Sequence, residues 1–358
     1  MSALRILQIG LGGWGRDWAW RVIPAVDEVE LVGYVDSDPA AASRLEALIP
    51  GSAQDFFGSL AEALDATKPD AAVITTTIGG HAPLTRAALE AGLHVLVEKP
   101  FTETLEAGRE LVEVAATKSL TLMVSQNYRF FPAARTAARM LEEGSLGDLY
   151  SVSIDFRRNA AAPPRPRARH HSDAQPLLVD MSIHHFDLLR MLLDRDPSSI
   201  SCLTTSPAWS GFDGPPAAMA SILFDDLLVS YRASWISTGP ITPWAGEWRM
   251  EFERGQLFWT SRGDNGALND RVVLRPRRGR PRVLPLPVMA RIDRAGTLTE
   301  FARAVREGRE PETSGRDNLR TLAFTLAAVE SARHREWVAI TPSDGAPHEL
   351  RSRSGPRS

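Results

Sequence analysis

The chain has 358 residues, which is long enough to form two domains with hydrophobic cores of their own. Its 41 Lys and Arg residues nearly balance 44 Asp and Glu residues, so the composition does not favour nucleic acid as a partner. No stretch approaches about 20 uninterrupted apolar residues, and the single Cys202 excludes an internal disulfide and a multi-cysteine metal site. Because the N-terminus lacks a signal-like segment, we expect a cytoplasmic protein without membrane contacts.

The first 125 residues alternate short apolar runs with helical patterns. This alternation is typical of a parallel sheet with crossover helices. We expect strands at 4–10, 29–36, 70–77, 93–100 and 120–127. We expect helices at 14–25, 39–48, 81–91 and 103–118. Residues 1–125 are therefore predicted to form an open α/β domain.

The pattern changes after residue 125, where short runs of alternating apolar and polar residues become common. Between 196 and 290 these runs predict an antiparallel or mixed sheet with one solvated or partner-covered face. The other expected elements are helices at 132–143, 176–193, 293–307 and 314–334 and strands at 149–158 and 337–341. We predict a second domain over residues 126–342 and a flexible tail over residues 343–358.

The stretch 157–173 is rich in arginine and proline and is predicted to be a long loop. Three roles are open for it: a solvated loop, a lid or contact for an acidic substrate, and a contact with nucleic acid. Because no aromatic residues are interleaved with the arginines, nucleic acid is the least favoured, and we predict no nucleic-acid partner.

A glycine-rich turn, GLGGWG, follows the first strand and opens the first helix. Gly10, Gly12 and Gly15 have the GxGxxG spacing, in which the glycines permit a tight turn, close approach of a pyrophosphate and close helix–strand packing. Asp36 follows the second strand and can accept hydrogen bonds from both ribose hydroxyls while repelling a 2′-phosphate. We therefore expect NAD as the cofactor, although the neighbouring Ser37 leaves NADP open. A turn without a ligand is the alternative.

Lys99 belongs to the tripeptide EKP at the end of a predicted parallel strand. Open α/β domains bind ligands at this edge of the sheet. Only three of the 41 basic residues are lysines, so a lysine here suggests a role that requires an ammonium group. The alternative is an ordinary surface lysine at a strand end.

The helix expected at 176–193 carries three ionisable side chains on an otherwise apolar element. Asp180, His184 and Asp187 fall within about 60° of one another if each residue advances by ~100° around the axis. Since buried charge is costly unless it is paired or used, this face indicates a functional site. A structural network and a metal site are the alternatives, and we predict no metal. His185 points away from His184 and is expected to be structural.

Together these segments resemble the Gfo/Idh/MocA family of NAD(P)-dependent oxidoreductases over nearly the whole chain. The resemblance is carried by GLGGWG, Asp36, HAPLTRAALEAGLHVLVEKP (81–100), QNYRFFP (126–132), DMSIHHFDLL (180–189) and the run from 301 to 333. It implies an N-terminal Rossmann doubly wound parallel sheet and a C-terminal α/β domain with a large, mostly antiparallel sheet. That sheet would form the contacts of a homo-dimer or homo-tetramer. The implied reaction is hydride transfer between a nicotinamide cofactor and a secondary alcohol of a sugar, cyclitol or related polyol.

The resemblance also implies the site residues, with Lys99, Asp180 and His184 as the catalytic group. We expect His184 to be the general base and Lys99 to donate to the reacting oxygen, with Lys99 as the alternative proton acceptor. Tyr128 and Trp235 are expected to join them in binding the substrate. The residues expected around the cofactor are Gly10, Gly12, Gly13, Trp14, Gly15, Asp36, Ser37, Thr76, His81, Glu98, Lys99, Gln126 and Arg129. For residues 126–129, packing between the two domains is the alternative.

Two other functions remain open for the same scaffold. One is an NAD-dependent glycoside hydrolase, and the other is a non-catalytic regulator that senses a sugar or NAD. The presence of Lys99, Asp180 and His184 argues against the regulator, because a sensor does not need proton-transfer chemistry. The chain departs from the family pattern at Ser182, where a glycine is usual, and at TTTIGGH (75–81), and these departures bear on the substrate.

Overall fold

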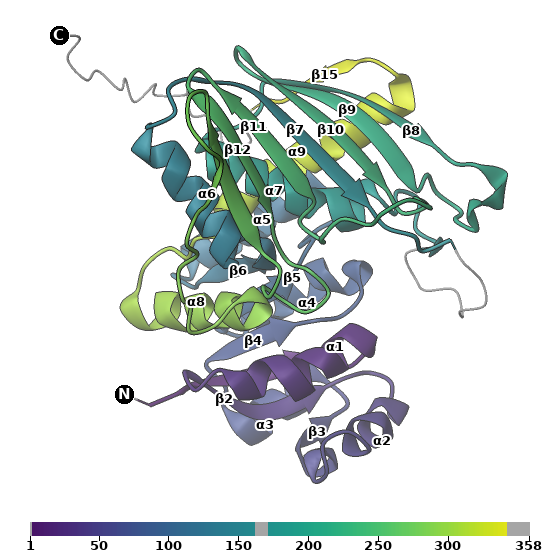
Figure 1. The fold of residues 1–358 in the computed structure, drawn as a ribbon. Coiled ribbons are helices and arrows are strands. Elements are labelled where there is room, and N and C mark those ends of the chain that lie inside the picture. Colours follow the sequence, from purple (N-terminus) through teal and green to yellow (C-terminus); the bar gives the residue numbers. More distant parts are fainter. Residues whose placement is uncertain (1, 162–170, 342–358) are drawn as a thin grey trace.

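The computed structural model describes residues 2–161 and 171–341, which form two β-sheets with helices between and around them (Figure 1). The first sheet has six parallel strands in the order β3-β2-β1-β4-β5-β6, the strand order of a Rossmann domain. These strands are β1 (Leu4–Ile9), β2 (Val29–Val35), β3 (Phe56–Phe57), β4 (Ala71–Ile74), β5 (His94–Glu98) and β6 (Leu122–Ser125). The predicted parallel sheet is confirmed, and β3 is an additional short strand.

Five helices accompany this sheet along the chain, of which α3 was not predicted. They are α1 (Gly13–Asp17), α2 (Ala40–Glu46), α3 (Leu60–Thr67), α4 (Ile78–Glu90) and α5 (Leu105–Thr117). After α1 the chain continues through a π-helical segment, Trp18–Val22, and a short 3-10 turn, Ile23–Ala25. Ser59 and Glu62 have the capping-box spacing at the start of α3, and the Ser59 hydroxyl accepts the Glu62 N–H. This signal was present in the sequence and could have revealed the helix.

Helices cover both faces of the first sheet, which explains why its strands are nearly continuous apolar runs. Residues of α3, α4 and α5 pack on one face in a core that includes Leu89 and Leu111. On the other face lie Trp18 and side chains of α8 (Asp293–Glu307), among them Leu298 and Phe301. Helix α8 thus packs on the first sheet although it follows the second sheet in the chain.

The second sheet has nine strands in the order β14-β13-β12-β11-β7-β10-β9-β8-β15. They are β7 (Leu149–Arg157), β8 (Ser199–Thr205), β9 (Ala217–Phe224), β10 (Leu227–Ser234), β11 (Glu247–Phe252), β12 (Gly255–Thr260), β13 (Arg271–Pro276), β14 (Arg282–Val283) and β15 (Trp337–Ala339). The β7–β10 pair is parallel and the other pairs are antiparallel. This arrangement confirms the large, mostly antiparallel sheet that was expected.

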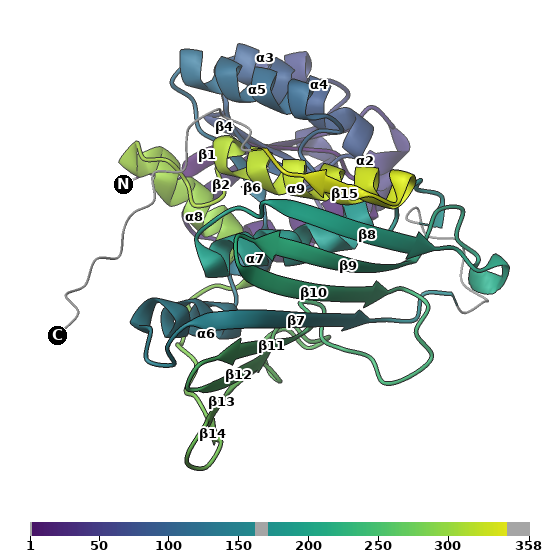
Figure 2. The same cartoon turned by 90° about the horizontal axis from the view of Figure 1, so that it is seen from above.

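One face of the second sheet packs on helices, and the other face is open. Helices α6 (Pro132–Glu143), α7 (Ile183–Leu193) and α9 (Gly315–His334) contribute to its core, and α9 lies between the two sheets (Figure 2). Burial alternates along β9 and β10, as expected for strands with one solvated face. The open face carries exposed apolar side chains of Tyr150, Leu203, Met219 and Leu228.

The helix expected at 176–193 has a different geometry in its first half. Residues Leu178–Ser182 form a π-helical segment, in which the Ser182 N–H bonds to the Leu177 carbonyl five residues earlier, and α7 follows directly. The wider turn changes the angular relation between Asp180 and Asp187. The expectation of one shared face for three ionisable groups is therefore wrong, because it assumed α-helical spacing throughout.

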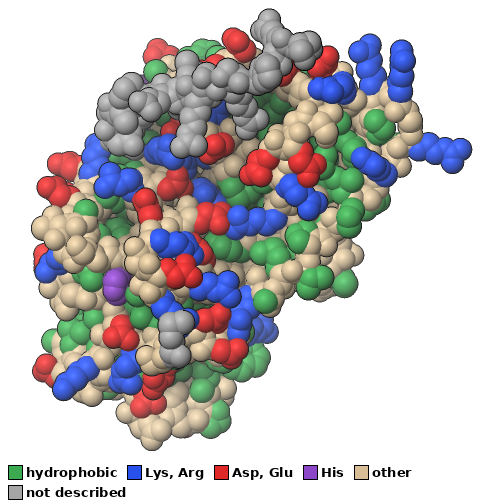
Figure 3. Space-filling model, turned by 90° about the vertical axis from the view of Figure 1, so that its left-hand side faces the viewer, with side chains coloured by type: hydrophobic (Ala, Val, Ile, Leu, Met, Phe, Trp, Pro, Cys, Tyr) green, Lys and Arg blue, Asp and Glu red, His purple; other side chains and the backbone are tan. Residues whose placement is uncertain are grey.

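The surface agrees with the nearly balanced composition. Over the middle of the face in Figure 3, Lys and Arg side chains lie among Asp and Glu side chains.

Within residues 2–161 and 171–341, no helix has both the length and the apolar character needed to cross a membrane. The same described residues hold no cluster of three or more His, Cys, Asp or Glu side chains suited to a metal ion. The greater part of the Arg- and Pro-rich stretch, residues 162–170, lies outside the described residues, as does the whole expected tail, residues 343–358.

Candidate active site

The glycine-rich turn after β1 contains glycines of two kinds. Gly10 has a positive φ of 98°, and a Cβ there would clash with Thr76. A Cβ at Gly15 would clash with the Gly10 carbonyl oxygen, so this glycine is required for close packing of α1 on the strand. At Gly12 and Gly13, by contrast, a Cβ would have nothing within 4 Å. The protein's own packing therefore does not require glycine at these two positions, whereas close approach of a pyrophosphate does.

The end of β2 meets the glycine-rich turn through Asp36. The Asp36 carboxylate accepts the Leu11 N–H at 2.6 Å and the Asp38 N–H at 2.9 Å, which fixes its orientation beside the turn. Ser37 is exposed next to it. An oriented carboxylate at this strand end fits the ribose of a bound dinucleotide, so the residues of this region fit NAD.

Trp14, which follows the two open glycines, is half exposed and faces the C-terminal part of the chain. The Arg294 guanidinium of α8 lies over its ring at 4.0 Å from the centroid and also pairs with Asp17. The second half of the chain therefore contributes to the wall beside the glycine-rich turn.

Glu98 and His81, both expected near the cofactor, use their side chains to hold the surrounding backbone and helices. The buried Glu98 carboxylate accepts the indole N–H of Trp18 at 2.8 Å. The His81 ring lies between the carbonyl oxygens of Pro100 at 2.8 Å and Thr76 at 3.2 Å. These contacts fix the positions of Glu98 and Pro100, the two residues on either side of Lys99 in the chain.

Lys99 extends from the end of β5 to the π-helical segment before α7. Its Nζ donates to the Asp180 carbonyl oxygen at 2.6 Å and to the Asp180 carboxylate at 2.7 Å. The Lys99 side chain is 13% exposed, while that of Asp180 is 43% exposed. The contact joins residues 81 positions apart in the sequence, from the two halves of the chain. The structure thus brings two of the three predicted catalytic residues together.

The third, His184, begins the second turn of this helical region and is buried. Its Nδ1 lies 3.2 Å from the Gln126 side-chain oxygen, which can only accept, so Nδ1 carries the proton. No described residue lies within hydrogen-bonding distance of Nε2, which is left as an acceptor. Burial, and then the positive charges of Lys99 and Arg262, hold the pKa of His184 well below its usual value. His184 is therefore neutral near pH 7.

Gln126 and Tyr128 surround His184 from the segment after β6. The Gln126 amide is buried, and its Nε2 has no hydrogen-bond partner among the described residues. The Tyr128 ring stacks on His184, with centroids 4.1 Å apart and an interplanar angle of 4°. Gln126 was expected beside the cofactor, and in this structure its side-chain oxygen contacts His184, which favours the tautomer with the proton on Nδ1.

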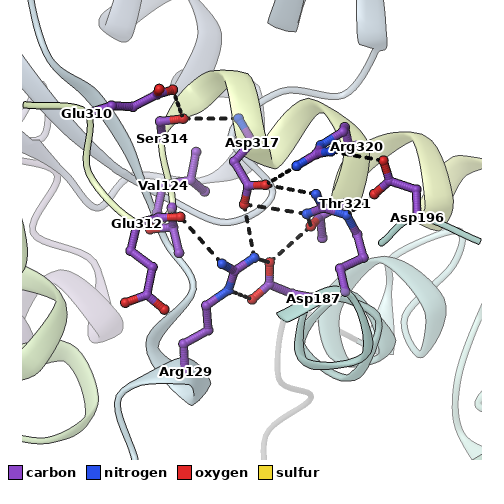
Figure 4. Close-up of polar contacts among 12 residues, drawn as sticks. Val124, Arg129, Asp187, Asp196, Glu310, Glu312, Ser314, Asp317, Arg320 and Thr321 are labelled. Atoms are coloured by element: carbon purple, nitrogen blue, oxygen red, sulfur yellow. Dashed lines mark hydrogen bonds and ion pairs between the residues drawn. The ribbon is translucent and has the colours of Figure 1, made fainter. Parts of the chain in front are cut away.

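Asp187 and Arg129 lie apart from this group, in a buried ion-pair network shown in Figure 4. The Asp187 carboxylate accepts from Arg129 Nε at 2.6 Å and Nη2 at 2.7 Å, and from the Thr321 hydroxyl at 3.0 Å. Arg129 Nη2 also donates to Asp317 at 3.0 Å. Burial opposes the charge, yet the carboxylates of Asp187 and Asp317 raise the pKa of Arg129 above its ordinary value. The Arg129 side chain, expected beside the cofactor, instead joins the segment after β6 to α7 and α9.

Asp317 is the centre of this network and comes from the first turn of α9. It accepts from Arg190 at 2.8 Å and from Arg320 at 2.9 Å in addition to Arg129. Burial opposes its ionisation, but Arg129 and Arg190 hold its pKa well below the usual range. The network joins α7 to α9 and to the segment after β6 through side chains other than those of Lys99, Asp180 and His184.

Two further predictions can be compared with the geometry. His185 lies between the Tyr231 hydroxyl and the Trp244 carbonyl, both at 2.9 Å, and burial lowers its pKa to about 4, which agrees with a structural role. Trp235, expected to bind substrate, is buried with edge-to-face contacts to Phe156 and Trp244. Packing accounts for this ring, and its burial does not support contact with a sugar.

The sequence interpretation missed a basic side chain that reaches the site from the second sheet. Arg262 follows β12 and donates through Nη1 to the Tyr128 hydroxyl at 3.2 Å. Its guanidinium also lies over the Tyr128 ring, 4.6 Å from the centroid. No sequence motif marked this residue, because its position depends on how the second sheet packs against the residues after β6.

Comparison with known proteins agrees with this architecture. Residues 4–126 match the model of the "Oxidoreductase family, NAD-binding Rossmann fold", and residues 134–257 match the "GFO/IDH/MocA C-terminal domain". The chain belongs to the Gfo/Idh/MocA oxidoreductase family. The resemblance stated from the sequence is thereby confirmed, and residues of the first domain form an NAD-binding Rossmann fold.

Individual members of the Gfo/Idh/MocA family match over nearly the full length. The chain is 28% identical to D-apiose dehydrogenase of Paraburkholderia graminis, covering 93% of this chain and 88% of the relative. It is 27% identical to inositol 2-dehydrogenase of Rhizobium meliloti, covering 93% and 98% of the two chains. Among solved structures, aldose-aldose oxidoreductase from Caulobacter crescentus has a TM-score of 0.81 at 17% identity, covering 94% of this chain and 100% of that one. These Gfo/Idh/MocA relatives include sugar and cyclitol dehydrogenases, which supports a polyol oxidoreductase at the level of the family.

Proposed function

We propose that this chain is an NAD-dependent dehydrogenase that oxidises a secondary hydroxyl group of a sugar, cyclitol or related polyol. The observation that carries the proposal is the contact of Lys99 with Asp180 beside a neutral His184. An ammonium group, a partly exposed carboxylate and a proton acceptor thus converge at the strand end where Rossmann domains bind their ligands.

The chain's own residues divide the proton chemistry among them. His184 Nε2 accepts the hydroxyl proton, because Gln126 holds the proton of the other ring nitrogen on Nδ1. Lys99 uses two contacts to Asp180, and its remaining N–H donates to the reacting oxygen and stabilises the charge that develops there. Asp180 holds the ammonium group in place, and its carboxylate accepts from a neighbouring substrate hydroxyl. Lys99 is the alternative proton acceptor.

The cofactor that fits this chain is NAD. Gly12 and Gly13 would let the pyrophosphate approach the backbone of a turn that depends on Gly10 and Gly15, and Asp36 would hold the adenosine ribose. When bound, NAD⁺ supplies the hydride acceptor for the oxidation. The orientation of Asp36 favours NAD over NADP, because its carboxylate would repel a 2′-phosphate.

The open face of the second sheet supports self-association as a homo-dimer or homo-tetramer. Tyr150, Leu203, Met219 and Leu228 expose large apolar side chains on four neighbouring strands of this sheet. Large apolar side chains exposed on one face of a sheet are typical of an interface between protein chains. Sedimentation velocity of the wild type and of Met219→Glu tests this assignment, and a wild-type monomer would contradict it.

A reduction screen tests the proposed activity. Purified protein is mixed with NAD⁺ or NADP⁺ and a panel of sugars, inositols, anhydrosugars and the corresponding sugar acids, and absorbance at 340 nm is followed. We expect stoichiometric NADH formation with at least one polyol, abolished by Lys99→Met. Cleavage of an aryl glycoside without net NADH would instead indicate the glycoside hydrolase. NAD binding without turnover of any compound would indicate the regulator.

A further inference from the structure

Arg262 has an unusual backbone conformation for a residue with a large side chain. It lies between β12 and β13 and has a φ of 58°, in the left-handed region that non-glycine residues rarely adopt. Asp270 holds it there, because one carboxylate oxygen accepts the Arg262 N–H at 2.7 Å and the other accepts the Ser261 hydroxyl at 2.8 Å. Residues kept in such conformations against a cost in free energy concentrate at functional sites.

The Arg262 side chain points from this turn toward the proposed catalytic group. It contacts the hydroxyl and the ring of Tyr128, and Tyr128 in turn stacks on His184. Its charge is close enough to contribute to the lowered pKa of His184. Arg262 and His184 therefore contact the same side chain, that of Tyr128, and His184 Nε2 is the proposed proton acceptor.

The guanidinium of Arg262 is incompletely paired when compared with that of Arg129. Arg129 uses its Nε and Nη2 edge to bind both oxygens of Asp187 at 2.6 and 2.7 Å. The same edge of Arg262 has no hydrogen bond to any described residue, and its nearest carboxylate, Asp293, lies 3.8 Å from Nε. The Nε atom is buried, whereas the side chain as a whole remains 16% exposed. Its Nη2 is thus the available donor.

We propose that Arg262 binds a carboxylate of the substrate, so that the preferred substrates of this chain are sugar acids or other polyols that carry a carboxylate. This inference rests on the proposed dehydrogenase function and adds the substrate class. A guanidinium N–H donated to a carboxylate is a charge-assisted hydrogen bond and is stronger than one donated to a neutral hydroxyl. The carboxylate would lie beside Tyr128, with the reacting hydroxyl toward Lys99 and His184.

The charge balance of the site favours a monoanion over a phosphate. Lys99 is paired with Asp180, and Arg158, which lies over the Trp244 ring, is paired with Asp264 at 2.8 Å. Arg262 is the basic side chain of this group that forms no hydrogen bond to a carboxylate of the described chain. Because the Asp293 carboxylate already lies 3.8 Å from Arg262 Nε, a singly charged ligand adds less uncompensated negative charge to this partly buried site than a dianionic phosphate would.

The experiment compares neutral and acidic members of matched substrate pairs, such as glucose with glucuronate and galactose with galacturonate. For the wild type we expect kcat/KM to be roughly 10- to 100-fold higher for the acid, the range expected of a hydrogen bond to a charged group. Arg262→Gln should bring the ratio of kcat/KM for the acid to kcat/KM for the neutral sugar close to one, because the acid loses a charge-assisted hydrogen bond that the neutral sugar never makes. Arg262→Lys, which keeps the charge without the planar fork, should retain part of the preference for the acid.

Arg271→Gln is the matched control. Arg271 belongs to the neighbouring strand β13 and also lies over an aromatic ring, that of Phe258, but its side chain is exposed. Its removal takes the same charge from the chain and should leave the preference for acids unchanged. Thermal unfolding of all three variants checks that each is folded.

The outcomes distinguish this inference from the proposed function. If neutral polyols are oxidised at least as well as their acids, or if Arg262→Gln lowers kcat/KM for both members of a pair equally, the inference is overturned while the dehydrogenase stands. If no polyol of either kind is oxidised, the proposed function itself fails. A preference for phosphorylated or nucleotide-linked sugars over sugar acids would also overturn the assignment of a carboxylate.

Discussion

The substitution Asp187→Asn tests whether Asp187 belongs only to the buried ion-pair network and not to the proposed catalytic group of Lys99, Asp180 and His184. In the wild type, Asp187 is 1% exposed and its two oxygens accept three hydrogen bonds, two of them from Arg129. Asparagine has a similar volume but no charge, and its NH₂ group would face a guanidinium that can only donate. Asp317 would then be the carboxylate that still accepts hydrogen bonds from Arg129, although it already accepts from Arg190 and Arg320.

The expected magnitude follows from the burial of both partners. Removing one member of a buried ion pair costs about 3–5 kcal/mol, because the other charge stays buried without compensation. A typical domain has a free energy of unfolding of only about 5–15 kcal/mol, so this loss is large. By contrast, kcat of the folded variant should remain within about ten-fold of wild type, because Asp187 does not contact Lys99, Asp180 or the His184 ring.

Urea unfolding followed by tryptophan fluorescence and circular dichroism measures the change, since nine tryptophans report on both halves of the chain. The matched control is Glu110→Gln, which breaks the exposed Arg86–Glu110 pair, with Glu110 53% exposed, and should cost less than about 1 kcal/mol. Asp180→Asn should show the reverse pattern, with lost turnover and little change in unfolding. An Asp187→Asn variant as stable as wild type, or one that is fully folded but inactive, would refute the division.

Three further predictions follow from the site. Lys99→Met should lower kcat by at least about 100-fold, as expected for loss of a preorganised charge. The same variant should change the Kd for NAD⁺ by less than about 3-fold in a fluorescence titration. A kcat near that of the wild type would show that Lys99 takes no part in the reaction. Gly12→Ala should weaken NAD⁺ binding without changing the midpoint of thermal unfolding. Gly15→Ala should lower that midpoint, because a Cβ at this position has no room. Equal effects of the two variants on NAD⁺ binding and on the midpoint would contradict the proposed position of the pyrophosphate. Burial lowers the pKa values of His184 and His185, the latter to about 4, so below pH 6.5 the unfolded chain binds protons that the folded chain does not. The free energy of unfolding should therefore decrease as the pH is lowered from about 8 to about 5, by about 2 kcal/mol from His185 alone. On the acidic side, the loss of kcat/KM should have its midpoint below pH 6.5. A midpoint at or above pH 6.5 would exclude His184 as the base.

Much of the N-terminal half could be predicted from local pattern alone. Buried parallel strands are continuous apolar runs, and the glycine-rich turn with Asp36 has a spacing set by the geometry of one βαβ unit. Lys99 could be placed at the ligand-binding edge for the same reason, because strand ends of a parallel sheet share one edge. The missed helix α3 was a failure of interpretation, since its capping-box residues Ser59 and Glu62 were visible.

The partners of the charged residues could not be predicted in this way. Asp180, His184 and Asp187 are close in sequence, but a π-helical turn and two different neighbours separate them, so that Lys99 binds one carboxylate and Arg129 binds the other. A prediction from periodicity assumes a constant angle per residue around the helix axis. It carries no information about which side chains of other segments pack against the helix.

Sequence by itself determined the Rossmann sheet, the cofactor turn and the identity of the proposed catalytic group. Only the tertiary structure decided which buried charges are compensated within the protein and which remain available to a ligand. Gln126 selects the tautomer of His184, and Arg262 reaches Tyr128 from 134 positions away in the sequence. The physical reason is that a buried charge is stabilised by whatever the fold places against it, and such neighbours come from distant segments.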